Sequence, residues 1–261
     1  MAPSKKSSSN SNAPAAKSVI CVGPAGWCYP DWFCYVYPSR RRKGFHDATY
    51  LAEFFDTIEI NTSFYNPIRP DHSVQWIDRV AANPRFVFTA KLWQRFTHET
   101  IGKNPDPADS PGAASPAMVA ATNQPIIGRS LEPGAESTSP IGYVRLHGRR
   151  YDTWFTDDPA VPSHERYNYL YSTEELAPWA KRVAKVAERS REVFVITNNH
   201  YQGKGVVNAL QLISILKRSK VKVPEPLRVQ YPELEAIADS PLAEPSLFPM
   251  KNSEQRIVGG E

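Results

Sequence analysis

Long apolar runs are absent from this sequence. No stretch approaches the roughly 18 consecutive apolar residues that a membrane-spanning helix needs, and the amino terminus lacks the apolar core of a signal peptide. We therefore expect a soluble, cytoplasmic protein that makes no membrane contact. The net charge of +4, from 31 Lys and Arg against 27 Asp and Glu, is too small to require a nucleic-acid partner, and we do not expect one.

Cysteine is scarce. The three cysteines are Cys21, Cys28 and Cys34, and an odd number without a second cluster argues against a disulfide framework. Their spacing contains no C-x2-C pair, which disfavours a zinc or iron-sulfur site. We expect reduced thiols in the core and predict no metal ligand.

Several catalytic signatures are also missing. The sequence contains no G-x-x-x-x-G-K-[ST], no G-x-S-x-G, no G-x-G-x-x-G after a strand and no H-E-x-x-H. Nucleotide-triphosphate hydrolysis, serine-hydrolase chemistry and Rossmann cofactors therefore have no support, and the cofactor stays unknown. Only the short stretch at 203–205, Gly-Lys-Gly, could present backbone N–H groups to an anion at a helix start.

Alternating strand-like and helix-like segments are present, and 41% hydrophobic residues suffice for a substantial core. This alternation is typical of α/β proteins with a parallel sheet. Residues 1–18 are rich in Ser, Ala, Asn and Lys and are expected to be a disordered leader, and residues 218–261 a weakly ordered tail. Strands are expected over 19–23, 57–61, 85–91, 117–123, 143–147 and 193–197, and helices over 46–55, 71–82, 173–189 and 206–217.

Local signals sharpen the helix boundaries. Asp47 is a plausible N-cap of the first helix, and Ser172 with Glu175 forms a capping-box pattern before 173–189. In the second helix, Val74 and Ile77 share one face with Val80. Between the third strand and residue 143 the composition changes to proline-rich, turn-forming stretches typical of linkers.

The strand over 143–147 carries polar residues on one face. Because alternate strand residues point to opposite sides, Tyr143, Arg145 and His147 share one face while Val144 and Leu146 pack on the other. Other predicted strands also end in polar or aromatic residues. In a (β/α)8 barrel such strand ends converge on one pocket.

A set of motifs resembles the YecE-like family, also called domain of unknown function 72. The motifs are GPAGWCYPDW (23–32), TIEINTSFY (57–65), FVFTAK (86–91), TH (97–98), YVRLHGR (143–149), YNYLYS (167–172) and VITNNHYQGKGVVNAL (195–210). The resemblance implies a TIM-like (β/α) barrel over 19–217 but no reaction, because the activity of the family is itself unassigned.

The sequence departs from the family between residues 99 and 142. Three β/α units would need roughly 90 residues, whereas this interval offers 44. About two units are therefore missing, and we expect an incomplete barrel of about six strands. Such a barrel would be impaired, or would close by pairing its third strand with the strand near 120 or by dimerisation, so the oligomeric state stays open.

Candidate site residues follow from these strand ends. Glu59, His147 and Lys91 are candidate catalytic groups, because a buried carboxylate or an imidazole can transfer protons near neutral pH and a lysine can stabilise negative charge. Glu59 could equally form a structural ion pair with Lys91 or Arg145. The expected substrate-binding residues are Trp27, Tyr29, Asn61, Tyr65, His98, Arg145, Asn198 and Asn199. The aromatic members could instead serve only as packing.

Two functional hypotheses follow, and a third is weaker. The first is an enzyme acting on a small polar metabolite, phosphorylated or sugar-like, with Lys91 and Arg145 stabilising negative charge. The second is a non-catalytic or degenerate barrel that acts as a binding protein. The third is a nucleic-acid-processing barrel, by analogy with endonuclease-IV-like barrels. A small-molecule ligand is expected in the first two cases.

Overall fold

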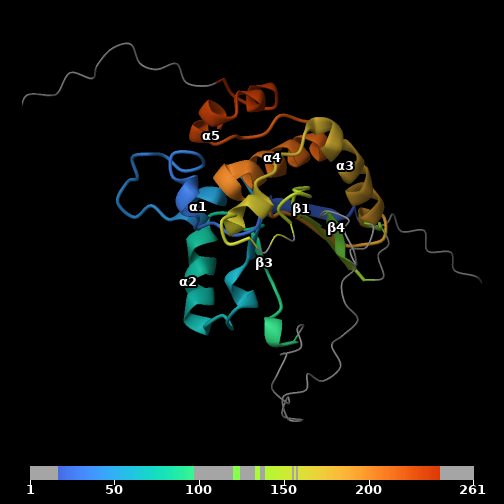
Figure 1. Cartoon of the computed structure of the whole chain (residues 1–261), viewed down its shortest axis with the longest axis horizontal. Helices are drawn as coiled ribbons and strands as arrows, with labels where there is room; N and C mark the ends of the chain where they lie inside the picture. The colour runs from blue at the N-terminus through green and yellow to red at the C-terminus, as the bar shows by residue number, and fades with distance from the viewer. Residues whose placement is uncertain are drawn as a thin grey trace, which may run out of the picture.

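The computed structural model describes residues 17–96, 120–123, 133–135, 139–154, 156 and 158–241. Within these ranges the chain is a mixed α/β protein, as the sequence predicts (Figure 1). The strands are β1 (Val19–Pro24), β2 (Thr57–Ile60), β3 (Val87–Ala90), β4 (Ala120–Asn123), β5 (Ile141–Leu146) and β6 (Glu192–Thr197), and the α-helices are α1 (Asp47–Leu51), α2 (Pro70–Val80), α3 (Thr173–Ala187), α4 (Lys204–Lys217) and α5 (Glu225–Gln230).

All strand pairs in the described residues are parallel. One sheet has the order β1-β6-β5-β4, and a second contains β2 and β3. A parallel bridge between Ala25 and Glu59 places β2 beside β1, so the strands follow one another as β3-β2-β1-β6-β5-β4. No ladder among the described residues joins β3 to β4, so the expected pairing of these strands and a closed barrel are not found.

The close approach of β1 to β2 depends on Gly23. A Cβ atom at this position would lie 1.9 Å from the backbone oxygen of Thr57, which no side chain permits. The strands on either side of β1, which are β2 and β6, are apolar: Ile58, Val195 and Ile196 are completely buried. Glycine at position 23 therefore allows β2 to lie where its end meets those of β1 and β5.

Helices α3 and α4 pack side by side on the strands, and α5 lies beyond α4 (Figure 1). The predicted capping box is present: the Ser172 hydroxyl accepts the Glu175 N–H, and the Glu175 carboxylate accepts the Ser172 N–H. Helix α1 differs from the prediction, because its N-cap is His46 and not Asp47. The Nδ1 atom of His46 accepts the Ala48 N–H at 3.2 Å, so imidazole fills the role expected of the carboxylate.

The segment after residue 217 is better packed than expected. Residues 218–241 contain α5 and the short helix Pro232–Ala236, and Leu227 and Leu234 are fully buried. Val221 accepts the Asp239 N–H and donates its own N–H to Ile237, which ties the two ends of the segment together. Proline-rich composition suggested weak order, but these apolar side chains pack against the core.

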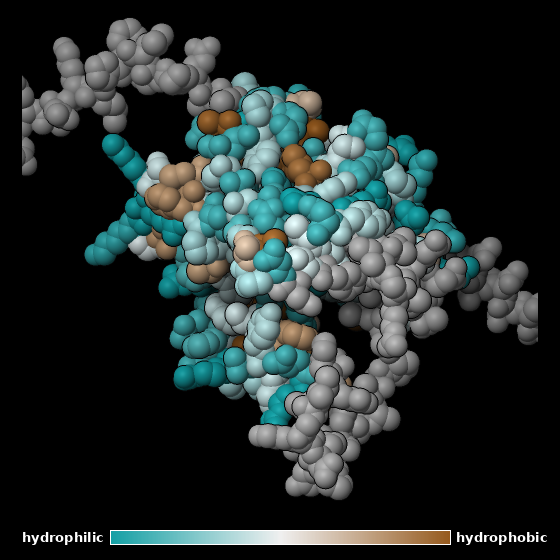
Figure 2. Space-filling view, viewed as in Figure 1, coloured by the Kyte–Doolittle hydropathy of each residue, from teal (hydrophilic) through white to brown (hydrophobic). Residues whose placement is uncertain are grey.

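Helix α2 buries less than its sequence pattern suggests. Val80 is buried, but Val74 and Ile77 are each 59% exposed, and Val87 on the neighbouring β3 is 43% exposed. In the described residues, no further strand covers this end of the sheet. Elsewhere, the face in Figure 2 is mostly hydrophilic with small, separate hydrophobic groups.

The cysteines are free thiols, as expected, but only one lies in the core. Cys21 on β1 is buried, whereas Cys28 and Cys34 are exposed. The two exposed residues belong to the aromatic segment after β1, outside the sheet, which the sequence pattern did not resolve. Residues 1–16 of the expected leader (1–18), most of the linker-like interval (99–142, of which 120–123, 133–135 and 139–142 are described) and residues 242–261 lie outside the described residues.

Candidate functional site

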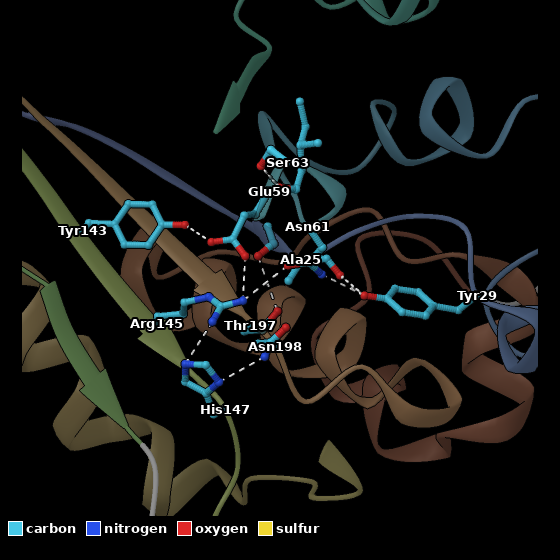
Figure 3. Close-up of polar contacts among 12 residues, drawn as sticks. Ala25, Tyr29, Glu59, Asn61, Ser63, Tyr143, Arg145, His147, Thr197 and Asn198 are labelled. Carbon is cyan, nitrogen blue, oxygen red and sulfur yellow. Dashed lines mark hydrogen bonds and ion pairs between the residues drawn. The ribbon is translucent and has the colours of Figure 1, made fainter. Parts of the chain in front are cut away.

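The carboxyl-terminal ends of β1, β2, β5 and β6 bring several predicted site residues together. Figure 3 shows the side chain of Glu59 between Tyr143 and Arg145, with His147 beyond Arg145 and Asn61 on the other side. Tyr143, Arg145 and His147 follow one another at alternate positions, as predicted from the strand period. The polar face of β5 therefore points at the end of β2.

Glu59 is the centre of this group. Its carboxylate is 2% exposed and accepts a hydrogen bond from Nη2 of Arg145 at 2.6 Å and another from the Tyr143 hydroxyl. Burial and the Glu59 charge raise the pKa of Tyr143, which keeps the hydroxyl protonated and able to donate. A carboxylate removed from water needs such partners, so the ion pair expected as one alternative for Glu59 is present, with Arg145 and not with Lys91.

His147 extends the chain from Arg145. Its Nε2 lies 3.1 Å from Nη1 of Arg145, and its Nδ1 lies 3.0 Å from Nδ2 of Asn198. Arginine can only donate, so Nε2 accepts. Burial and the charges of Arg145 and Lys91 lower the pKa of His147 well below its usual value, so the ring is neutral.

A second series of hydrogen bonds leads from Arg145 to the aromatic segment after β1. Nη2 of Arg145 lies 3.4 Å from Oδ1 of Asn61, and Nδ2 of Asn61 donates to the Tyr29 hydroxyl at 3.0 Å. The Tyr29 hydroxyl in turn donates to the backbone oxygen of Ala25 at 2.8 Å (Figure 3). Asn61 and Tyr29, both predicted site residues, therefore join the same network.

Four successive ring contacts link Tyr29 to His147 around this network. Tyr29 stacks on His200 with ring centroids 4.3 Å apart, and His200 contacts Tyr167 at 5.0 Å. Tyr167 contacts Trp154 at 6.1 Å, and Trp154 meets the edge of His147 at 5.7 Å. We define the aromatic rim as Tyr29, His200, Tyr167 and Trp154. Burial lowers the pKa of His200 to about 4, so this ring is also neutral at pH 7.

Sequence reasoning did not select three members of this rim or Tyr143. His200 directly follows the predicted strand-end residues 198–199, and Tyr143 lies on the polar face of β5, so both carried a positional signal. Trp154 and Tyr167 lie in the segment between β5 and α3, where no periodicity shows which side chains point inward.

Lys91 directly follows β3 and is half-buried near the same network. Its ammonium group lies 5.6 Å from the centre of the Phe64 ring. Burial, and then the charge of Arg145, lower the pKa of Lys91 to about 8, while Glu59 acts in the opposite direction. Among the described residues, no hydrogen bond or ion pair engages the Lys91 ammonium, unlike the guanidinium of Arg145.

Other predicted site residues have different surroundings. Trp27 packs against Trp76 and Phe88, with centroids 5.3 and 5.7 Å apart, as in the packing alternative. Tyr65 is 61% exposed and contacts Phe64. These two side chains take no part in the polar network.

Asn199 and His98 also lie apart from it. The Asn199 amide is buried and donates to Asn208 and to the backbone oxygen of Tyr169, both at 2.7 Å, so it joins α4 to the segment before α3. His98 lies outside the described residues. At the start of α4, Lys204 donates to Asn168, so its ammonium is already engaged.

The described part of the chain contains no group of three or more His, Cys, Asp or Glu side chains placed to hold a metal ion. None of its helices combines the length and the apolar character needed to cross a membrane.

The chain is similar to a known protein family. The family model described as protein of unknown function DUF72 matches residues 21–133 and 108–231. The UPF0759 protein YunF of Bacillus subtilis is 34% identical over 74 residues, and this match covers 28% of the chain and 26% of that protein. The chain thus matches about a quarter of the length of that curated relative.

Solved structures of DUF72 family proteins are similar to this chain in fold. A DUF72 family protein from Thermotoga maritima superposes with a TM-score of 0.56 and 22% identity, over 76% of this chain and 99% of that one. A DUF72 family protein from Enterococcus faecalis has a TM-score of 0.59 and 16% identity, over 76% and 96% of the two chains.

Proposed function

The chain belongs to the DUF72 family of proteins of unknown function, and we propose that it is an enzyme acting on a small anionic metabolite, phosphorylated or sugar-like. The ligand would lie at the carboxyl-terminal strand ends, between Lys91 and the aromatic rim. The proposal rests on one observation, the balance of charged side chains at these strand ends. Glu59 is engaged by Arg145, whereas the nearby Lys91 has no carboxylate partner among the described residues.

An unpaired, half-buried ammonium favours an anion. A phosphate or carboxylate group beside Lys91 would supply the missing negative charge, and the neighbouring Arg145 would add to the positive potential. The rings of the aromatic rim offer apolar faces that suit the C–H face of a sugar, and the amides of Asn61 and Asn198 suit hydroxyl groups. These features favour a phosphorylated sugar over a neutral one.

Lys91 is the side chain left to transfer a proton at these strand ends. Both carboxylate oxygens of Glu59 accept hydrogen bonds, and the Nε2 lone pair of His147 is taken by Arg145. We therefore propose that Glu59 and His147 fix the position of Arg145, and that Lys91 acts as the acid or base. This revises the roles expected from the sequence, in which Glu59 and His147 were the proton-transfer groups and Lys91 stabilised negative charge.

A binding protein without catalysis is the second candidate. The engagement of both Glu59 and His147 in a fixed network favours it, because neither is free to exchange a proton with a ligand. Turnover distinguishes the two: a binding protein would retain its ligand unchanged after prolonged incubation.

We further propose that the six described strands belong to a TIM-like barrel shortened between β3 and β4. Their parallel order and the convergence of polar groups at one end support this, as does the match of the family model in two stretches, 21–133 and 108–231, and not in one. Grafting the corresponding stretch of the Thermotoga relative in place of residues 99–142 should raise the melting temperature. An unchanged or lower value would count against the shortened barrel.

Thermal shift with a ligand panel tests the proposed function. The panel contains inorganic phosphate, sugar phosphates and the matching neutral sugars. We expect the melting temperature to rise with sugar phosphates and to change little with neutral sugars, since ligand binding stabilises the folded state. If no anion in the panel produces a shift, or if neutral sugars act equally, the proposed anion site is wrong.

A further inference from the structure

Lys91 has an unusual position among the described lysines. It directly follows β3, and its backbone N–H reaches the oxygen of Ile60 on β2 at 3.4 Å, which fixes the start of its side chain at the strand ends. By contrast, Lys204 donates to Asn168, and Lys222 forms an ion pair with Glu53. The Lys91 ammonium faces the Phe64 ring instead of an oxygen acceptor in the described part of the chain.

The surroundings of this amine disfavour its charged form. The charged and titratable groups that face it are Glu59 from β2, Arg145 and His147 from β5, and His200 after β6. Both imidazoles are neutral, and Glu59 is shared by Arg145 and Tyr143, so little negative charge remains to hold the ammonium. With a pKa of about 8, about a quarter of the Lys91 side chains are neutral at pH 7.5, against about one in a thousand for an ordinary lysine.

We infer that Lys91 is a nucleophile that forms an imine with the carbonyl group of an aldehyde or ketone ligand. The inference rests on the proposed function and deepens it, because it narrows the ligand class to carbonyl compounds that also carry an anionic group. Partial burial next to another cation, which for Lys91 is the Arg145 guanidinium, is one way to activate an amine for this step.

The reaction is balanced without a further reagent. The lone pair of the neutral Nζ attacks the carbonyl carbon, and one of the two Nζ protons passes to the carbonyl oxygen to give a carbinolamine. The C–O bond then breaks and the hydroxyl leaves as water with the remaining Nζ proton, which leaves a C=N bond between Nζ and the former carbonyl carbon. In the assay below, the hydride that reduces this bond comes from added cyanoborohydride.

Reductive trapping tests the inference. The protein is incubated with glyceraldehyde 3-phosphate or with glyceraldehyde in the presence of cyanoborohydride, and modified lysines are mapped by peptide mass spectrometry. We expect Lys91 to be labelled at least about tenfold faster than the exposed Lys220, faster with the phosphate ester than with glyceraldehyde. Lys91→Arg should abolish this fast labelling, whereas Lys220→Arg should not change it.

The pH profile provides a second readout on the wild-type protein. Labelling of Lys91 should rise with pH and level off above about 8, while labelling of Lys220 continues to rise toward the pKa of an ordinary lysine. Labelling of Lys91 at the rate of Lys220, with both aldehydes and at all pH values, would overturn the inference.

The outcomes separate this inference from the proposed function. Sugar-phosphate binding without fast trapping at Lys91 would leave the anion site standing and remove the nucleophile. Fast trapping that is equal for glyceraldehyde and its phosphate would support the nucleophile and remove the anion preference.

Discussion

Arg145 on β5 donates to Glu59 on β2 at 2.6 Å across 86 positions of the sequence. The two strands belong to different ladders, since β2 pairs with β3 and β5 pairs with β4 and β6. The side chains are 13% and 2% exposed, so this ion pair is largely removed from water. It therefore joins the two sheets at the end where the polar network lies.

Removing the negative charge of Glu59 should lower the free energy of unfolding. Glu59→Gln leaves the Arg145 guanidinium buried without a counter-charge, and we expect the free energy of unfolding to fall by about 3–5 kcal/mol. Urea denaturation measures this value. The matched control is Glu53→Gln, which breaks the exposed pair with Lys222 and should cost less than about 1 kcal/mol. Equal effects of the two substitutions would contradict the structural role of Glu59.

The Tyr143 hydroxyl supports the same carboxylate. Tyr143→Phe removes a hydrogen bond to a buried charge without changing the ring, so we expect a loss of about 1.5–3 kcal/mol in unfolding free energy. Tyr151→Phe, at a 54% exposed position, should change stability by less than about 0.5 kcal/mol. A neutral effect of Tyr143→Phe would mean that Glu59 does not depend on this donor.

The contact between β1 and β2 gives a backbone prediction. Gly23→Ala places a Cβ 1.9 Å from the Thr57 oxygen, so β2 must move, and we expect a loss of stability above about 3 kcal/mol. Gly44→Ala meets no atom within 4 Å but retains a positive φ of 83°, so only about 1 kcal/mol of backbone strain is expected. Thermal unfolding of both variants measures the difference.

His200 should make stability depend on pH. Its folded pKa is about 4, below the ordinary value near 6.5, so the unfolded chain binds the extra proton first as pH falls. The stability is fully present above about pH 6.5, is lost progressively below it, and levels off near pH 4. We expect the wild type to lose about 2 kcal/mol more than His200→Gln between pH 7 and pH 5.

Denaturation at the two pH values in both proteins checks this difference. The groups facing His200 include Asp31, which opposes the shift, and His164, Lys91 and Arg145, which favour it. Since all four remain in the variant, the comparison isolates the imidazole. Parallel pH dependence of wild type and variant would show that His200 is not held neutral.

Strand periodicity predicted the parts of the site that belong to regular elements. The alternation over 143–147 gave the shared face of Tyr143, Arg145 and His147, and the convergence of strand ends suggested that Glu59 would meet Arg145. The capping box of α3 was also readable, because it depends on residues only three positions apart.

Features that depend on irregular segments were not predictable. Trp154 and Tyr167 reach the aromatic rim through a segment without periodicity, and nothing local shows that Tyr29 stacks on a histidine 171 positions later. The exposure of Val74 and Ile77 also escaped prediction, because an amphipathic pattern identifies an apolar face but not what covers it.

The most direct test of the anion site is calorimetric titration with glucose 6-phosphate and with glucose. We expect saturable binding of the phosphate ester to wild type and to Lys220→Gln, binding about tenfold weaker or more in Lys91→Gln, and little binding of glucose. Equal affinity of Lys91→Gln and wild type for glucose 6-phosphate would contradict the account, as would equal binding of the two sugars.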